Sequence, residues 1–346
     1  MSIRRFVTSG AALTLLALGA GSPAWGCGGL VGENGTVQLV KTTTLAAFHN
    51  GVQRYVTSFE FTGAGEEVGS IVPLPGVPTA VERGGDWTLQ RLAREVAPPL
   101  AQGRAESAGA VAASAQVLLE TKIDALDITV LKGGGDEVGE WATKNGFVLT
   151  PDSPEVLDFY AARSPIFMAA KFNASRAALL GQGRGDGTPI MITIPLDEPW
   201  VPLRILGLGL DGAQIVEADV FLLTDAEPDL LAGGPGLTLS RSENASSSLL
   251  TDLRTDKGME WVPPDMWLTY LQLEAPAAEL DYDLAISTTA GREPLRAAAG
   301  LDLSDSAVHI SSHHGRPLWP IAIVVGGAAV LVVSFVRARV RSGAVE

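Results

Sequence analysis

The sequence predicts a strand-rich, two-lobed α+β ectodomain with a few short helices, followed by one C-terminal transmembrane helix. Segments in which apolar residues alternate outnumber segments with helical periodicity, and the helical segments are short. Residues 318–336 are an uncharged apolar run of 19 residues. As a helix this run would extend about 28 Å, close to the roughly 30 Å hydrocarbon core of a bilayer.

The N-terminus has the features of a secretory signal peptide over residues 1–26. Arg4 and Arg5 form a basic segment, residues 11–20 are apolar but too few to span a bilayer, and small residues precede Cys27. We therefore expect cleavage just before Cys27. An uncleaved N-terminal anchor is the alternative.

The charges beside the apolar run predict its orientation. Three arginines follow it within five residues, whereas Arg316 alone lies close before it. Because positive charges are retained on the cytoplasmic side, residues 337–346 are predicted to be a short cytoplasmic tail. The protein is thus expected in the cell membrane as a single-pass protein, with its N-terminus outside and its C-terminus in the cytoplasm.

The chain is acidic, with 25 Lys and Arg against 39 Asp and Glu and a net charge of −14. Six of these arginines and one glutamate lie in the signal peptide and from Arg316 onward, so the segment between them carries −19. Such a charge repels nucleic acid, which excludes nucleic acid as a partner. The membrane, an envelope protein or a cationic ligand remain as predicted partners.

Cysteine use indicates the compartment. Cys27 is the only cysteine, so no intrachain disulfide can form. Eukaryotic secreted domains commonly contain disulfides, and a bacterial envelope protein is therefore the better interpretation. As the first mature residue, Cys27 also raises lipidation as an alternative, although Trp25 fits poorly where such a motif needs a small residue.

The N-terminal lobe is predicted over residues 27–98. Asn50-Gly51 suits the two-residue turn of a hairpin over residues 36–62, because both residues tolerate positive φ. Three prolines within residues 70–78 argue against a central strand and favour an extended crossing at a sheet edge. A helix capped by Asp86 is expected over 87–96.

A linker rich in Ala, Gly and Ser is predicted over 99–116, and a second lobe over 117–288. Its expected strands are 117–123, 126–131, 147–149, 166–172, 189–194, 202–208 and 215–223, and its expected helices are 136–144 and 154–162. Residues 226–265 read as irregular, and 266–273 with 280–287 as a final strand pair or a short helix and a strand. Residues 289–317 are small and polar and are predicted to form a stalk.

Several short segments carry a resemblance to a known family. They are the mature start Cys27–Leu30, Gly69–Pro78 with the following Trp87–Leu89, Lys144–Phe147, Val201–Arg204, and Trp267–Leu271 followed by Asp283-Leu284. In this order they resemble the bacterial domain-of-unknown-function 2330 family (DUF2330). The resemblance implies an exported, often membrane-anchored protein. It supplies no activity and no site residues.

Four motifs bear on possible chemistry. Gly207–Gly212 matches G-x-G-x-x-G, but a strand rather than a helix is expected after it, so we interpret it as a turn. Arg184-Gly185-Asp186 could be an adhesion tripeptide or a chance loop sequence. The histidines and carboxylates read as solvated groups rather than metal ligands: His309, His313, His314; Asp225, Glu227, Asp229; Asp252, Asp256; Asp281, Asp283.

The remaining histidine, His49, lies beside a turn with no evident partner. The sequence therefore predicts no catalytic, cofactor-binding or metal-binding residue and no cofactor, and it leaves an enzymatic role open. The leading hypothesis is a non-catalytic extracellular binding or structural module tethered by the C-terminal helix. The alternative is an envelope hydrolase that uses dispersed Asp and Glu residues.

Overall fold

The computed structural model describes residues 29–32, 37–38, 42–58, 62–63, 67–97, 116–181, 188–301 and 308–310. The predicted signal peptide 1–26, the transmembrane run 318–336 and the tail 337–346 lie outside the described residues, as does nearly all of the predicted linker. No helix among the described residues is long and apolar enough to cross a membrane.

The described chain is a strand-rich α+β fold, as predicted. Its largest sheet has seven strands in the order β15-β16-β13-β3-β4-β11-β7, in which only β13 and β3 are parallel neighbours. In that order the strands are Leu237–Asn244, Trp267–Pro276, Ile215–Thr224, Thr42–His49, Val52–Thr57, Ile190–Pro195 and Ala80–Arg83.

A second sheet has five strands in the order β1-β6-β10-β9-β8. They are Gly29–Gly32, Glu67–Pro73, Ile166–Asn173, Leu126–Lys132 and Gln116–Ile123. A four-stranded sheet, β12-β17-β14-β18, consists of Trp200–Val201, Leu284–Ser287, Asp229–Ala232 and Val308–Ile310. Val37–Gln38 (β2) and Thr62–Gly63 (β5) form a two-stranded ladder.

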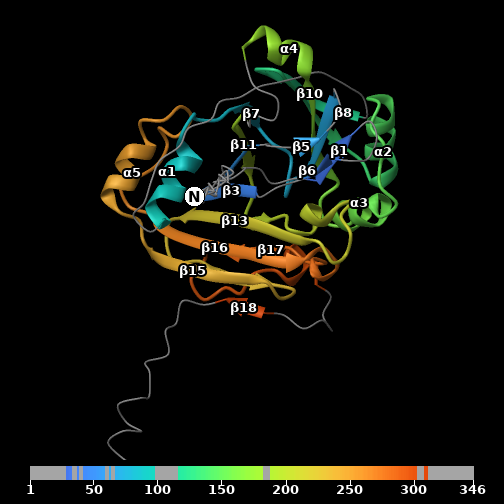
Figure 1. Cartoon of the computed structure of the whole chain (residues 1–346). Coiled ribbons are helices and arrows are strands. Elements are labelled where there is room, and N and C mark those ends of the chain that lie inside the picture. Colours follow the sequence, from blue (N-terminus) through green and yellow to red (C-terminus); the bar gives the residue numbers. More distant parts are fainter. Residues whose placement is uncertain are drawn as a thin grey trace, which may run out of the picture.

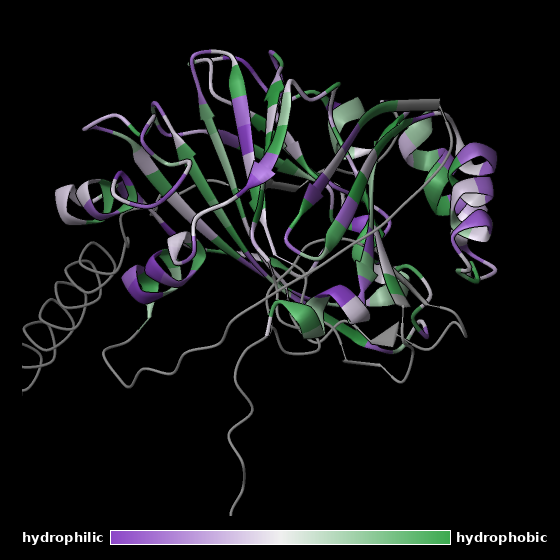
Figure 2. Ribbon diagram, turned by 90° about the horizontal axis from the view of Figure 1, so that it is seen from above, coloured by the Kyte–Doolittle hydropathy of each residue, from purple (hydrophilic) through white to green (hydrophobic). Residues whose placement is uncertain are grey.

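Short helices flank the strands on both sides (Figures 1 and 2). They are α1 (Thr88–Val96), α2 (Gly135–Lys144), α3 (Ser153–Ala161), α4 (Ala174–Leu179) and α5 (Ser247–Leu253), with 3-10 turns η1 (Arg204–Gly207), η2 (Ala277–Glu279) and η3 (Arg296–Ala299). Helices α1 and α5 lie on one side, and α2 and α3 on the other (Figure 1).

Two hydrophobic cores follow from this layering. Leu45 of β3 and Phe221 of β13 pack with Leu92 of α1 and with α5 in one core. Ala46, the residue between Leu45 and Ala47, points to the opposite face, as strand alternation requires. That face joins the five-stranded sheet and helices α2 and α3 in the larger core.

The hairpin prediction is confirmed. Strands β3 and β4 pair with His49 opposite Val52, and Asn50 and Gly51 form the turn with φ of 52° and 72°. Helices α1, α2 and α3 agree with their predictions within one residue at each end. In these segments local signals are sufficient, because turn chemistry and periodicity are read from neighbouring residues.

The predicted division into lobes at 27–98 and 117–288 is corrected by the sheet order. Strands β3, β4 and β7 come from the first stretch and pair with β11 and β13 from the second. Likewise β6 lies between β1 and β10 in the five-stranded sheet. The two stretches therefore share both large sheets, because strand pairing between distant segments leaves no mark in local composition.

The proline-rich segment is also corrected. Residues 67–73 form β6, an interior strand, although the prolines predicted an edge crossing. Pro73 is the last residue of β6 and pairs on the β10 side with Phe167, whereas the pairing with β1 ends at Ile71. The missing N–H of Pro73 thus falls beyond the β1 ladder and breaks no bond in it.

Several further predictions of secondary structure are wrong. Residues 202–208 contain η1 instead of a strand, 147–149 form only an isolated bridge at Val148, and 226–265 contain β14, β15 and α5 instead of an irregular segment. The predicted final pair, β16 and β17, belongs to different sheets. The described part of the predicted stalk is packed: η3 buries Ala299, and β18 pairs with β14.

Helix α1 is capped by a residue distant in sequence. Asp86 was predicted as its cap, but the carboxylate of Asp256 accepts from the backbone N–H of Asp86 and Trp87 at 3.1 Å each. It also accepts the Thr88 hydroxyl at 2.7 Å and the N–H of Lys257 at 3.0 Å. Asp256 therefore joins the start of α1 to the segment 254–266.

Gly85 provides the space for this carboxylate. A Cβ at residue 85 would lie 2.0 Å from Asp256 Oδ2, and four hydrogen bonds hold that oxygen's carboxylate in place. Gly85→Ala should lower the free energy of unfolding by about 2 kcal/mol, by overpacking and loss of the cap. Urea denaturation followed by circular dichroism measures this change.

Gly139→Ala is the matched control. Gly139 lies within α2, where a Cβ would meet Leu149 Cδ1 at an ordinary 3.5 Å. Alanine should raise stability there by about 0.5–1 kcal/mol. Equal stability of the two variants would contradict the assigned role of Gly85.

Candidate ligand-binding cleft

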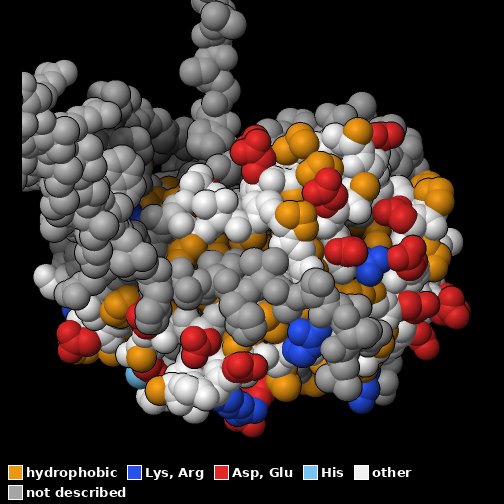
Figure 3. Space-filling model, turned by 90° about the horizontal axis from the view of Figure 1, so that it is seen from below, with side chains coloured by type: hydrophobic (Ala, Val, Ile, Leu, Met, Phe, Trp, Pro, Cys, Tyr) orange, Lys and Arg blue, Asp and Glu red, His pale blue; other side chains and the backbone are white. Residues whose placement is uncertain are grey.

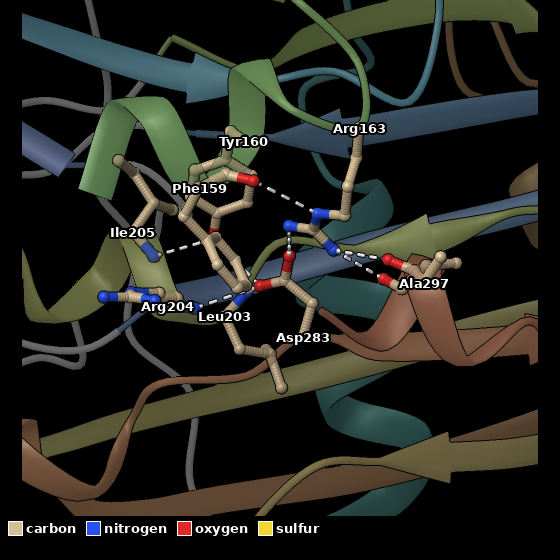
Figure 4. Close-up of polar contacts among 9 residues, drawn as sticks. Phe159, Tyr160, Arg163, Leu203, Arg204, Ile205, Asp283 and Ala297 are labelled. Carbon is tan, nitrogen blue, oxygen red and sulfur yellow. Dashed lines mark hydrogen bonds and ion pairs between the residues drawn. The ribbon is translucent and has the colours of Figure 1, made fainter. Parts of the chain in front are cut away.

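Two polar centres stand out in the described structure, and the first surrounds Asp283. Its side chain is fully buried, and Oδ1 accepts the Tyr160 hydroxyl at 2.8 Å and the N–H groups of Leu203 and Arg204 at 2.7 and 3.1 Å (Figure 4). Oδ2 accepts from Arg163 Nη2 at 2.5 Å. One carboxylate thus receives four donors.

The side chains that donate to Asp283 also make other contacts within the protein. Arg163 Nη1 donates to the carbonyl of Ala298 at 2.8 Å, and its guanidinium lies 4.2 Å from the centroid of the Phe159 ring. The Tyr160 oxygen accepts the N–H of Ile205 at 2.9 Å. Burial raises the pKa of Tyr160 well above its ordinary value, so this phenol stays protonated and donates. The centre is closed and leaves no free group for a ligand.

The predicted solvated character of the carboxylates is thus wrong for Asp283 and for Asp256, which is 4% exposed. Asp281 and Asp252 are accessible, and Asp252 accepts from Arg91 Nε at 2.8 Å. No three His, Cys, Asp or Glu side chains in the described ranges are grouped as a metal site would require.

The other sequence candidates are placed as follows. Residues 207–212 end η1 and turn into β13, as interpreted, with Gly209 at a φ of 74°. His309 lies on β18, while His313, His314, Arg184-Gly185-Asp186 and Cys27 lie outside the described residues. His49 does have a partner: its Nδ1 lies 2.5 Å from Asp225 Oδ1.

The second polar centre is an open cleft of about 800 Å³, within the size range of small-molecule sites. It lies where the edge strand β7 meets the turn between β8 and β9. Its lining residues are Arg54, Ala80, Val81, Glu82, Arg83, Thr121, Lys122, Ile123, Asp124, Met191, Thr193, Lys257, Gly258, Glu260 and Trp261.

Trp261 is the main aromatic side chain of this cleft. Arg54 Cζ lies 4.3 Å from the centroid of the Trp261 ring, and the His49 imidazole stacks with the indole at 6.3 Å between centroids. The buried indole N–H of Trp261 has no hydrogen-bond partner. Met259 and Val262, 1% and 2% exposed, anchor the segment on either side of it.

The charges of the cleft are unevenly paired. Arg83 forms ion pairs with two acids, Asp124 at 2.7 Å and Asp86 at 2.5 Å. Among the described residues, the Arg54 guanidinium has no ion pair or hydrogen bond, and its one recorded contact is the cation–π contact with Trp261. Burial lowers the pKa of Arg54, since no carboxylate offsets the cost of removing its charge from water.

Asp127 lies beside the cleft, on the strand that pairs with the one carrying Lys122. Burial raises the pKa of Asp127 to about 6, against the attraction of Arg176, Lys122 and Lys171. Its Oδ1 accepts from Arg176 Nη2 at 2.9 Å. The charged neighbours of Asp127 are therefore cations, which differs from a hydrolase pair of facing carboxylates.

The residues of this cleft escaped prediction from sequence. One signal does exist for Arg54. Val52, Arg54 and Val56 alternate on one face of a strand, and Val56 is buried in the core, so a charged residue interrupts an apolar row. Trp261 lies in a stretch read as irregular, and no local pattern distinguishes it.

A family model described as "Uncharacterized protein conserved in bacteria (DUF2330)" matches residues 22–224, more than half of the chain. The chain belongs to the DUF2330 family. The match includes Arg54 and the strands that line the cleft up to Thr193, and it ends before Trp261 and Asp283. The family description gives no activity.

No curated protein matches the DUF2330 chain. Among solved structures, the crystal structure of baculovirus P35 aligns at 8% identity and a TM-score of 0.37, covering 74% of this chain and 95% of that one. A mutated baculovirus P35 after caspase cleavage aligns at 8% identity and a TM-score of 0.35, covering 71% and 95%. Similarity this low supports no argument about this chain.

Removal of the Asp283 carboxylate should destabilise the fold strongly. Asp283→Ala leaves Arg163 buried without its counter-charge and two backbone N–H groups without an acceptor. We expect a loss of about 3–5 kcal/mol in the free energy of unfolding, measured by chemical denaturation. Asp281→Ala, two residues away and exposed, is the control and should change stability by less than about 0.5 kcal/mol.

The raised pKa of Asp127 predicts a pH dependence of stability. The folded protein binds a proton here more tightly than the unfolded chain, so stability from this group is full below about pH 4 and falls as the pH rises through about 6. Asp127→Asn should show a flatter decline between pH 4 and 6 in urea titrations. Parallel profiles for the two proteins would contradict the assignment.

Proposed function

We propose that this DUF2330 protein is a non-catalytic binding module of the bacterial cell envelope. An N-terminal signal peptide exports it, the span 318–336 tethers it, and the module faces outward. The observation that supports binding is the cleft beside β7, with an aromatic wall at Trp261 and an unpaired cation at Arg54.

The contrast between the two polar centres supports this site. The Asp283 centre is closed and its donors and acceptors are used within the protein. In the cleft, by contrast, the Arg54 guanidinium has no hydrogen bond or ion pair to any described residue. A partly buried cation without a counter-charge costs stability, and a ligand that supplies the counter-charge recovers that cost.

The hydrolase alternative remains a prediction. Of the three carboxylates that line the cleft, Asp124 is bonded to Arg83. Glu82 and Glu260 are both exposed to solvent. No observation on the described residues favours general acid–base catalysis over binding, so binding is the function that the geometry supports best.

The topology can be tested on cells. Protease added to intact cells whose outer barrier has been opened should digest the ectodomain and leave a small membrane-embedded fragment containing residues 318–336. An epitope tag placed after Glu346 should resist digestion until detergent dissolves the membrane. Complete protection of the ectodomain would contradict the proposed location.

The binding role can be tested by native mass spectrometry of the full chain, extracted from its own membranes in detergent. The wild-type protein should carry a bound adduct that is lost in Trp261→Ala, because that variant removes the aromatic wall. Trp267→Ala is the matched control, since this half-buried tryptophan lies outside the cleft and donates to Ser242. An adduct that is absent from wild type, or that survives in Trp261→Ala, would contradict the proposal.

A further inference from the structure

The proposed binding function leaves the chemistry of the ligand open, and the Arg54 end of the cleft constrains it. A guanidinium has five N–H donors and no acceptor. Arg54 donates to no other residue in the part of the chain that the structure describes, while its Cζ lies over the Trp261 ring at 4.3 Å. The donors at its edge are therefore available to an acceptor that enters the cleft.

The Trp261 ring limits the positions of this group, because Arg54 Cζ lies over it. The fixed fork of N–H donors in a guanidinium suits a two-pronged contact with a carboxylate or phosphate. The His49 ring stacks with the same indole, and Asp225 holds His49 through a 2.5 Å contact. Trp261 is thus braced in its position, and Arg54 is oriented before a ligand arrives.

A second cation lines the same cleft. Lys257 follows Asp256, which is fixed by its contacts to the start of α1, and no described acid is bonded to the Lys257 ammonium. Arg83 and Lys122 also line the cleft, but Arg83 is bonded to Asp124, and Lys122 lies 3.8 Å from Asp127. Arg54 and Lys257 are therefore the cations left for a ligand.

Resting on the proposed function, we infer that the cleft binds a small ligand through a carboxylate or phosphate group, held by Arg54 with Lys257 and seated against Trp261. The exposed acids Glu82 and Glu260 also line the cleft and disfavour ligands with a large negative charge. This ligand differs from the cationic ligand that the acidic composition leaves as one possible partner.

The test uses the full chain in detergent micelles, labelled with 5-fluorotryptophan and observed by fluorine NMR. Trp261→Phe identifies the Trp261 resonance among those of the other tryptophans. Sodium phosphate and sodium acetate are titrated separately at constant ionic strength, with chloride as the balancing anion. We expect a saturable shift of the Trp261 resonance with phosphate, acetate or both, and none with chloride.

Variants assign the shift to the proposed groups. Arg54→Gln should weaken the apparent affinity at least tenfold, Arg54→Lys should restore part of it, and Lys257→Gln should weaken it by a smaller factor. Arg94→Gln, which removes an exposed arginine of α1, should leave the affinity unchanged. Thermal unfolding of each variant shows that it is folded, and the fluorine spectrum of the other tryptophans provides a second check.

The outcomes are distinct. A third titration uses phosphatidylglycerol vesicles. The inference is overturned if no saturable shift appears with phosphate, acetate or these vesicles, or if the shift is unchanged in Arg54→Gln. A response to phosphatidylglycerol vesicles without a response to the free anions, if lost in Arg54→Gln, supports the same contact with a lipid head group as its source. If native mass spectrometry finds an adduct dependent on Trp261 while no anion binds, the proposed function stands and only this ligand class fails.

Discussion

The buried carboxylate of Asp283, directly before β17, joins four parts of the chain. It contacts α3 through Tyr160, the segment after α3 through Arg163, and the turn at Leu203, and Arg163 extends the contacts to the carbonyl groups of η3. Taking a carboxylate and a guanidinium out of water costs several kcal/mol for each group, and only a full set of hydrogen bonds offsets that cost. With Cys27 as the only cysteine, the chain has no intrachain disulfide, and this ion pair connects segments about 120 residues apart instead.

Asp256 performs a related role on the opposite side of the seven-stranded sheet. It caps α1 and fixes the start of the segment that carries Lys257 and Trp261, so the stability of the fold and the shape of the cleft depend on one carboxylate. The acidic surface elsewhere is of a different kind. On the face shown in Figure 3 acidic side chains are scattered over the surface, and lysine and arginine are few. There carboxylates confer solubility, whereas the buried Asp256 and Asp283 define structure.

The sequence was sufficient where the determinants are local. Asn50-Gly51 specified the β3–β4 turn, and the helical signals of their own residues predicted α2 and α3 within one residue at each end. It was insufficient where distant strands pair, as between β6 and β10, because each partner shows only its own pattern. The same limit hid the structural roles of Asp283 and Asp256, which look like surface acids in the sequence. Most of the groups that donate to them are at least 80 residues away.

The net charge of the protein bears on what the cleft can select. A net charge of −14 repels small anions from the surface. This repulsion is screened beyond roughly 8 Å at physiological ionic strength. Anion affinity must then come from short-range contacts, in which Arg54 is already stripped of part of its water and already oriented by Trp261. An anionic ligand that reaches this arginine offsets the free-energy cost of its partial dehydration, which no described acid offsets in the folded protein. The surrounding acidity discourages anions elsewhere on the surface, so the two effects together favour binding at one place over weak binding at many.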